Sequence, residues 1–285
     1  DELLKICKGN PIGVENVGSL GSLTLLSCTQ KGLKILSING VSSQRFRESL
    51  TEEHSDKRDA LSLAKYVKVR DDLPEVKLTD EQLALRSLCS LRDDLVQEKT
   101  RSINRLHSLL FNTYGSEYKE LFKELQSQKA LAFFQRFPSV NSVVKNREKA
   151  EVMYGKKLDF IGDDVYPDGE TLKTLEWNIQ YLCKRIMDLK EEILNVERKM
   201  KIVSLKDSRT KMLKSLPGLG LVTLCRLLAW LLPIENFENE SKFAAYLGVA
   251  LAKEQSGGNK GRGKRRKFYH RQLKICYVFY ISNTN

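Results

Sequence analysis

Closely spaced cysteines and histidines are absent from this sequence. It contains six cysteines and three histidines in 285 residues. The cysteines stand far apart, at Cys7, Cys28, Cys89, Cys183, Cys225 and Cys276. Structural zinc sites and the disulfide frameworks of small secreted domains both need such residues at short spacings. The spacing therefore disfavours both kinds of site and indicates a protein of the reducing cytoplasm.

Long apolar runs are also missing. The apolar stretch from Leu219 to Leu232 is interrupted by Thr223 and Arg226 and ends at Pro233. A membrane-spanning helix, by contrast, needs about 20 consecutive apolar residues. The N-terminus shows no secretory signal pattern. We therefore expect a cytoplasmic protein without a membrane-spanning segment.

Acidic residues are outnumbered by basic ones. The chain has 48 lysines and arginines against 36 aspartates and glutamates, which gives a net charge of +12. An excess of this size indicates a polyanionic partner, with nucleic acid the leading candidate ahead of a membrane surface. The length allows one large domain or two to three smaller ones.

The positive charge is concentrated near the C-terminus. Between Ser256 and Lys274 there are eight lysines or arginines and no acid, interspersed with glycines. A hydroxyl in a pliable, cationic, glycine-rich loop suits chemistry on a phosphate backbone, because such a loop approaches closely and neutralises charge. A flexible basic tail explains the composition equally well.

A glycine-rich turn precedes this segment. Gly218 and Gly220 separate a predicted helix over 208–215 from an apolar helix over 221–231. The arrangement is typical of a helix-hairpin-helix device, whose backbone N–H groups at a helix N-terminus bind a phosphate without reading sequence. Glycines between helices also serve as simple caps, so both interpretations stay open.

The first 70 residues predict alternating strands and helices. We expect strands at 12–15 and 33–38 and helices at 19–30, 43–50 and 56–67, a pattern typical of an α/β unit with a parallel sheet. Glu15 lies at a strand end, where α/β folds place their sites. Asp56 and Asp59 share one face in the first turn of a helix. Together such carboxylates bind Mg²⁺ for phosphoryl transfer, although the helix dipole alone also favours acids at a helix start.

Two long helices are predicted in the middle of the chain. One runs from Thr79 to Phe111. The other follows an apolar repeat with alternating steps of three and four residues: Leu172, Leu175, Ile179, Leu182, Ile186, Leu189, Ile193, Val196, Met200 and Val203. This seam favours a coiled coil, whose partner is either the first helix folded back antiparallel or the same helix of another subunit. Residues 141–169 show weak periodicity and predict no element.

In combination, these motifs resemble one protein family. The resemblance rests on segments in chain order: Val14–Gly18, His54–Ala60, Arg101–Leu110, Pro217–Gly220, Phe243–Gly248 and Gln255–Gly258 with its basic continuation. The chain is similar in these segments to the "one-ten" insertion-sequence transposases, which are relatives of the Piv DNA invertase. The resemblance covers most of the chain.

The resemblance implies three parts. These are a partial RNase-H-like (RuvC-like) DEDD α/β domain over 1–72, a helical region with a long antiparallel coiled-coil arm over 75–206, and a mostly helical serine transposase domain with the helix-hairpin-helix turn over 208–285. It also implies the partners: double-stranded DNA, a structured guide RNA from the element and further copies of the chain in a dimer or tetramer, in the nucleoid-associated cytoplasm of a prokaryotic cell.

Catalytic and binding residues follow from the same resemblance. Glu15, Asp56 and Asp59 would bind Mg²⁺ or Mn²⁺, and Ser256 would attack a DNA phosphate and form a covalent link. A serine is a weak nucleophile until its proton is removed, and a carboxylate or a metal-bound hydroxide can remove it. We expect the DNA contacts to come from Gly218, Gly220, Lys260, Arg262, Lys264, Arg265, Arg266 and Lys267.

Two departures from the family pattern bear on activity. The family's first Asp lies on an initial strand well before the Glu motif, and Asp1 is too close to Glu15 to be that residue. After Lys267, Phe268–His270 and Leu273–Lys274 replace a glycine-containing turn and an arginine. We therefore expect a chain truncated at both ends, and the alternative to a transposase is a non-catalytic nucleic-acid-binding remnant. A third alternative is a coiled-coil scaffold with an incidental basic tail.

Overall fold

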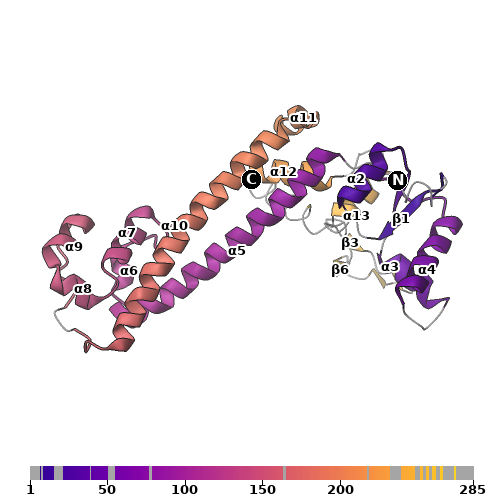
Figure 1. Ribbon diagram of the computed structural model, residues 1–285. Coiled ribbons are helices and arrows are strands. Elements are labelled where there is room, and N and C mark those ends of the chain that lie inside the picture. The colour runs from indigo at the N-terminus through magenta and orange to yellow at the C-terminus, as the bar shows by residue number, and fades with distance from the viewer. Residues whose placement is uncertain are drawn as a thin grey trace. The chain divides into compact units, whose positions relative to one another are not determined.

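Helices make up most of the described chain, and the strands are short (Figure 1). The computed structural model describes residues 7, 9–15, 22–38, 40–50, 55–76, 79–162, 165–216, 218–231 and 239–247, and then residues 251–252, 255–256, 259–260, 264–265 and 273. The chain divides into two compact units, one formed by residues 1–89 and 200–285 and the other by residues 90–199. No helix within the described ranges is long and apolar enough to cross a membrane.

Two parallel strands organise the N-terminal part of the first unit. They are β1 (Ile12–Glu15) and β2 (Ile35–Ile38), joined through α2 (Ser22–Gln30). The register places Glu15 beside Ile38 at the carboxyl ends of both strands. The apolar side chains of β2 are buried, and Ile35 shares a core with Leu26, Val76 and Leu83. The predicted strand–helix–strand unit with parallel strands is confirmed.

Two further helices pack at this end of the sheet. They are α3 (Gly40–Glu48) and α4 (Asp56–Val69). The side chain of Ser55 caps α4 by accepting a hydrogen bond from the backbone N–H of Arg58, which is why the helix begins at Asp56 as the sequence predicts. The helix over 43–50 is also confirmed, but it begins three residues earlier, at Gly40.

Close packing of α4 against β1 requires a glycine in the strand. A Cβ atom at Gly13 would lie 2.7 Å from Ile38 Cδ1 and closer still to Val67 Cγ2 of α4. These distances are shorter than real carbon–carbon contacts, so the side chains of Val67 and Ile38 would have to shift to admit any side chain at this position. Gly13 therefore allows the close packing of β1 and α4, the two elements that carry Glu15 and Asp59.

The second unit contains most of two long antiparallel helices, α5 (Asp80–Tyr114) and α10 (Glu170–Ser204). Their direction follows from two ion pairs: Arg92 Nε lies 2.8 Å from Glu197 Oε1, and Arg185 Nη2 lies 2.8 Å from Glu98 Oε1. The predicted apolar stripe of α10 is buried except at Leu175 and Val203, which are half-buried. The long internal hairpin is thus present, while the coiled-coil assignment and a role in assembly stay predictions.

Four short helices between α5 and α10 form a compact head. They are α6 (Tyr118–Leu121), α7 (Gln128–Arg136), α8 (Val140–Lys145) and α9 (Arg147–Tyr154). Their core is aromatic. The ring centroids of Phe122 and Phe133 lie 5.4 Å apart in an edge-to-face arrangement, and those of Phe133 and Phe134 lie 5.6 Å apart. The sequence predicted no element over 141–169, and part of this head lies in that gap.

Among its described residues, the C-terminal part of the first unit has three helices and two small antiparallel strand pairs. The helices are α11 (Thr210–Lys214), α12 (Leu221–Trp230) and α13 (Glu240–Leu247). The strand pairs are β3 (Leu251–Ala252) with β6 (Lys264–Arg265), and β4 (Gln255–Ser256) with β5 (Asn259–Lys260). The two predicted helices on either side of the glycine turn are confirmed, whereas the strands were not predicted in this glycine-rich segment.

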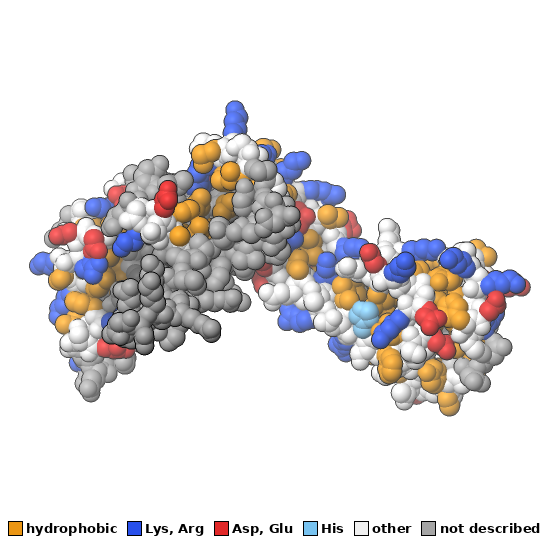
Figure 2. Space-filling model, turned by 180° about the vertical axis from the view of Figure 1, so that it is seen from behind, with side chains coloured by type: hydrophobic (Ala, Val, Ile, Leu, Met, Phe, Trp, Pro, Cys, Tyr) orange, Lys and Arg blue, Asp and Glu red, His pale blue; other side chains and the backbone are white. Residues whose placement is uncertain are grey.

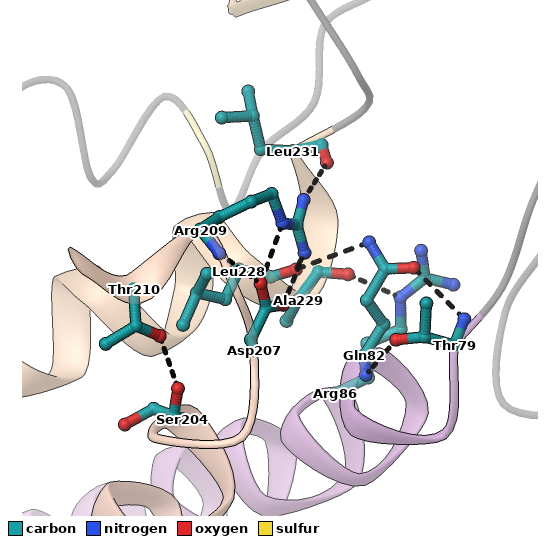
Figure 3. Close-up of polar contacts among 10 residues, drawn as sticks. All are labelled: Thr79, Gln82, Arg86, Ser204, Asp207, Arg209, Thr210, Leu228, Ala229 and Leu231. Carbon is teal, nitrogen blue, oxygen red and sulfur yellow. Dashed lines mark hydrogen bonds and ion pairs between the residues drawn. The ribbon is translucent and has the colours of Figure 1, made fainter. Parts of the chain in front are cut away.

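Side chains from distant segments bind the carbonyl groups at the C-terminal end of α12 (Figure 3). Arg86 Nε of α5 donates to Ala229 O at 2.8 Å, and Gln82 Nε2 donates to Leu228 O at 3.5 Å. Arg209 donates to Leu228 O at 2.9 Å and to Leu231 O at 3.2 Å. The last carbonyls of a helix have no partner within the helix and carry its negative dipole end. Two guanidinium groups therefore stabilise this end of α12.

Two of these donors, Arg209 and Gln82, are themselves held in place, and we call the set of contacts from Gln82, Arg86 and Arg209 to α12 the clamp. Arg209 forms a two-point ion pair with the buried carboxylate of Asp207. Gln82 closes a capping box with Thr79 at the start of α5, because each backbone N–H donates to the other's side chain. Tyr246 donates to Trp230 O at 3.0 Å, and burial raises the pKa of this phenol to about 12, so the proton stays on the oxygen. Residues 79–86 and α12 are thereby fixed to each other.

We predict that Gly13→Ala weakens the strand pair. The added methyl group must displace Val67 or Ile38, and overpacking of this kind costs about 1–3 kcal/mol. Amide hydrogen exchange in β1 and β2 should accelerate by about 5- to 150-fold, which corresponds to that cost. Gly40→Ala is the matched control, because nothing lies within 4 Å of a Cβ at Gly40. Equal exchange rates in the two variants would contradict the packing argument.

We also predict that Arg86→Ala lowers the melting temperature. Ala229 O would lose a charged donor in a buried position, at a cost of about 1–3 kcal/mol. For a chain of this size the shift should be about 2–10 °C, measured by circular dichroism. Arg101→Ala, an exposed arginine on the same helix, should shift the melting temperature by less than about 1 °C. A shift no larger for Arg86→Ala than for this control would show that the clamp adds no stability.

Candidate active site

Glu15 and Asp59 meet across one arginine at the carboxyl end of the parallel strands. Arg47 Nη1 lies 2.7 Å from Asp59 Oδ2, and Arg47 Nη2 lies 3.6 Å from Glu15 Oε1. The side chain of Asp59, on α4, is 29% exposed. That of Arg47, on α3, is 18% exposed, and that of Glu15, on β1, is 30% exposed. The strand end and the helix start predicted to carry a carboxylate site are thus adjacent.

Residues on one face of α3 hold the glutamate. Ser43 and Arg47 are four residues apart in this helix, so they project from the same side. The hydroxyl of Ser43, which is buried, donates a hydrogen bond to Glu15 Oε1. The carboxylate accepts this hydrogen bond, and the ion pair with Arg47 at 3.6 Å is made to the same oxygen. The hydrogen bonds and ion pairs described for Glu15 all involve Oε1.

Asp59 has a buried oxygen with no described donor. Its Oδ2 pairs with Arg47, whereas Oδ1 is inaccessible to solvent and accepts no hydrogen bond from any described residue. A buried acceptor without a partner costs about 1–3 kcal/mol. Carboxylate oxygens are the ligands that Mg²⁺ prefers. The donor set and the unpaired oxygen therefore fit a divalent cation.

Asp56 is placed differently from the other two acids. It lies in the first turn of α4, one turn before Asp59, and its side chain is exposed. Within the described ranges no group of three or more acids, histidines or cysteines is arranged to hold a metal ion. The structure thus brings two of the three predicted ligands together, and the ligand role of all three stays a prediction.

Arg47 was not identified from the sequence. Its signal is weak, because basic residues are common in the last turn of a helix for dipole reasons alone. Arg45 and Arg47 both occupy the last turn of α3, and only the packing of α3 beside β1 and α4 distinguishes them. Arg47 lies nine residues before Asp56 in the sequence, so no local pattern links the two helices.

The predicted serine lies in β4, and its backbone pairs with that of Asn259 in β5. In the sequence, Gly257 and Gly258 stand between these two strands. The side chain of Ser256 lies outside the described residues. The same holds for the side chains of Lys260, Lys264 and Arg265, whose backbones lie in β5 and β6, and for the whole of Arg262, Arg266 and Lys267.

The two glycines of the turn have different conformations. Gly218 has φ 74°, a left-handed conformation that favours glycine. Gly220 precedes α12 in an extended conformation, with φ −71° and ψ 162°, and no side chain caps the helix there.

The face of the molecule shown in Figure 2 has no single patch that gathers the positive charge. On the face shown in Figure 2, lysines and arginines are spread over both units with acids among them. By contrast, residues 256–274 carry eight lysines or arginines and no acid, against a net charge of +12 for the whole chain. Most of the charge excess therefore belongs to that one segment.

Two family models match the chain. Residues 3–114 match a DEDD transposase model named for the insertion sequence IS110. Residues 210–279 match the model described as "Transposase IS116/IS110/IS902 family". The first region includes β1, α3 and α4 with the acid pair, and the second includes the glycine turn and β4.

Curated relatives are proteins of bacterial insertion elements. The IS110 43.6 kDa protein of Streptomyces coelicolor is 26% identical over 261 residues, covering 86% of this chain and 64% of its own length. The IS116 44.8 kDa protein of Streptomyces clavuligerus is 24% identical over 285 residues, covering 94% and 70%. The IS900 42 kDa protein of Mycobacterium paratuberculosis is 22% identical over 252 residues, covering 80% and 60%. The chain thus spans about two thirds of the length of these relatives.

The models and the relatives agree with each other and with the order of motifs along the chain. One transposase model covers the region with the parallel strands, and the other covers the region with the glycine turn and the serine. The relatives named for IS110 and IS116 align across both regions. This chain belongs to the IS116/IS110/IS902 family of insertion-sequence transposases.

Proposed function

We propose that this chain is a DNA transposase that joins a carboxylate site to a serine nucleophile. The observation that carries the proposal is the pairing of Glu15 and Asp59 across Arg47, inside the region matched by the DEDD transposase model. The β1–α2–β2 unit with parallel strands agrees with an RNase-H-like domain, in which acids at strand ends and on a neighbouring helix form the site.

Glu15, Asp59 and Asp56 are the ligands that we assign to Mg²⁺ or Mn²⁺. Such an ion would neutralise charge on a DNA phosphate and lower the pKa of a bound hydroxyl. The unpaired Oδ1 of Asp59 supports this assignment. Asp56 lies on the same face of α4 as Asp59, and we assign its exposed carboxylate as the third ligand.

Ser256 is the residue that we assign to the attack on DNA. Its Oγ forms a bond to phosphorus, its proton passes to a carboxylate, and the displaced sugar oxygen leaves with the cleaved strand. The product is a phosphoserine link that conserves the energy of the phosphodiester for rejoining. The glycines next to Ser256 give the backbone room to approach a DNA strand closely.

Double-stranded DNA is the proposed substrate. We propose that residues 256–274, here called the basic segment, bind its phosphates. Lys260, Arg262, Lys264, Arg265, Arg266 and Lys267 would neutralise phosphates, and the N–H groups after Gly218 and Gly220 would bind one as in a helix-hairpin-helix. We further propose that a structured RNA of the element selects the DNA and that two or more copies of the chain assemble on it. The charge excess of residues 256–274 supports contact with such polyanions.

The serine assignment predicts a covalent intermediate that one substitution removes. Wild-type protein, mixed with Mg²⁺, the element's RNA and its own end DNA, should give a protein–DNA adduct that survives a denaturing gel. Ser256→Ala should give none, because no other atom replaces the nucleophilic oxygen. Ser241→Ala, an exposed serine of α13, should retain the adduct. A persistent adduct in Ser256→Ala would exclude this residue as nucleophile.

DNA binding should depend on salt through the basic segment. Replacing Lys260, Lys264 and Arg265 with Gln should lower the slope of log K against log salt by up to about 3, because each lost phosphate contact lowers it by about 0.9. The matched control replaces three exposed lysines of the head, Lys149, Lys156 and Lys157. The slope is measured by fluorescence anisotropy at several salt concentrations. An equal slope of log K against log salt for the two triple variants would rule out the basic segment as the DNA-binding element. Salt-dependent binding by the wild type without any adduct would favour the non-catalytic remnant.

A further inference from the structure

The cation site proposed above leaves one arginine unexplained, and the inference drawn here rests on that proposed function. A guanidinium between two metal-binding carboxylates is unexpected, because it carries the same sign of charge as the ion. Arg47 nevertheless lies within ion-pair distance of both Glu15 and Asp59. The role of Arg47 follows from which oxygen of each carboxylate it contacts and which oxygen it leaves without a described partner.

Each carboxylate has one occupied oxygen and one oxygen without a described partner. Arg47 and Ser43 both contact Glu15 at Oε1, and Arg47 contacts Asp59 at Oδ2. Asp59 Oδ1 is buried and accepts no hydrogen bond from the described residues. A carboxylate fixed at one oxygen cannot rotate freely, so its other oxygen keeps a defined direction.

We propose that Arg47 is a positioning residue that fixes one oxygen of Glu15 and of Asp59 and leaves the second oxygens for the divalent cation. Arg47 does not compete with the ion, since the guanidinium and the ion use different oxygens of the same carboxylates. Ser43 assists from the same face of α3. The planar guanidinium suits this task because its two terminal nitrogens reach two acids at once.

The alternative role for Arg47 gives the opposite sign in a binding experiment. If Arg47 is a stand-in cation that the metal must displace, its removal strengthens metal binding, because the acids lose a competitor and the ion loses a repelling charge. If Arg47 positions the acids, its removal weakens metal binding even though the site becomes more negative. The direction of the change thus separates the two roles without any measurement of activity.

The experiment is a Mn²⁺ titration of the full chain, with free Mn²⁺ measured by electron paramagnetic resonance. Arg47→Gln should weaken Mn²⁺ binding by about 10- to 100-fold, the usual effect of losing a residue that orients metal ligands. Arg45→Gln is the matched control, because it removes the same charge from an exposed position in the same turn of α3. This control should change binding by less than about threefold.

A second variant keeps the test decisive if Arg47→Gln does not fold. Arg47→Lys retains the charge but not the two-point geometry, so it should also weaken Mn²⁺ binding relative to Arg45→Lys. Melting curves of the variants without Mn²⁺ distinguish loss of folding from loss of binding.

The outcomes separate this inference from the function on which it rests. Equal or tighter Mn²⁺ binding by folded Arg47 variants, with a wild type that binds, overturns the positioning role and leaves the metal site intact. A wild type that binds no Mn²⁺, or an Asp59→Asn variant that binds as well as wild type, overturns the metal site and the positioning role together.

Discussion

The ion pairs from Arg47 to Glu15 and Asp59 are the contacts on which the candidate site depends. Each partner comes from a different element, so the pairs form only where α3, α4 and β1 pack together. Gly13 allows that packing, because a side chain there would clash with Val67 of α4 and with Ile38. A small residue in the strand thus supports the approach of two acids that are far apart in the sequence.

The same unit connects this site to the segment that carries Ser256. Leu83 of α5 belongs to the core beneath the parallel strands. One residue earlier in α5, Gln82 binds the end of α12, and Arg86 does so one turn later. The core and the clamp therefore tie the region matched by the DEDD model to the region matched by the second transposase model. The proposed joint action of the acids and Ser256 requires such a connection.

Periodicity and turn signals in the sequence predicted the two long helices α5 and α10, the helices α2, α3, α4, α11 and α12, and the parallel strands. The apolar stripe from Leu172 to Val203 predicted α10, and Ser55 ahead of Asp56 predicted the start of α4. The head was missed because its helices are too short to show a period, and its core depends on rings such as Phe122 and Phe133. Contacts between distant polar groups, such as Arg86 with Ala229 O, leave no local pattern at all.

A crystal of the protein soaked in Mn²⁺ and measured at the manganese absorption edge tests the account most directly. The account predicts one anomalous peak bound to Asp59 Oδ1 and to Glu15, with the Arg47 guanidinium still on the opposite oxygens. A peak that displaces Arg47 from the acids, or saturating Mn²⁺ that binds elsewhere and leaves both carboxylates empty, would contradict it.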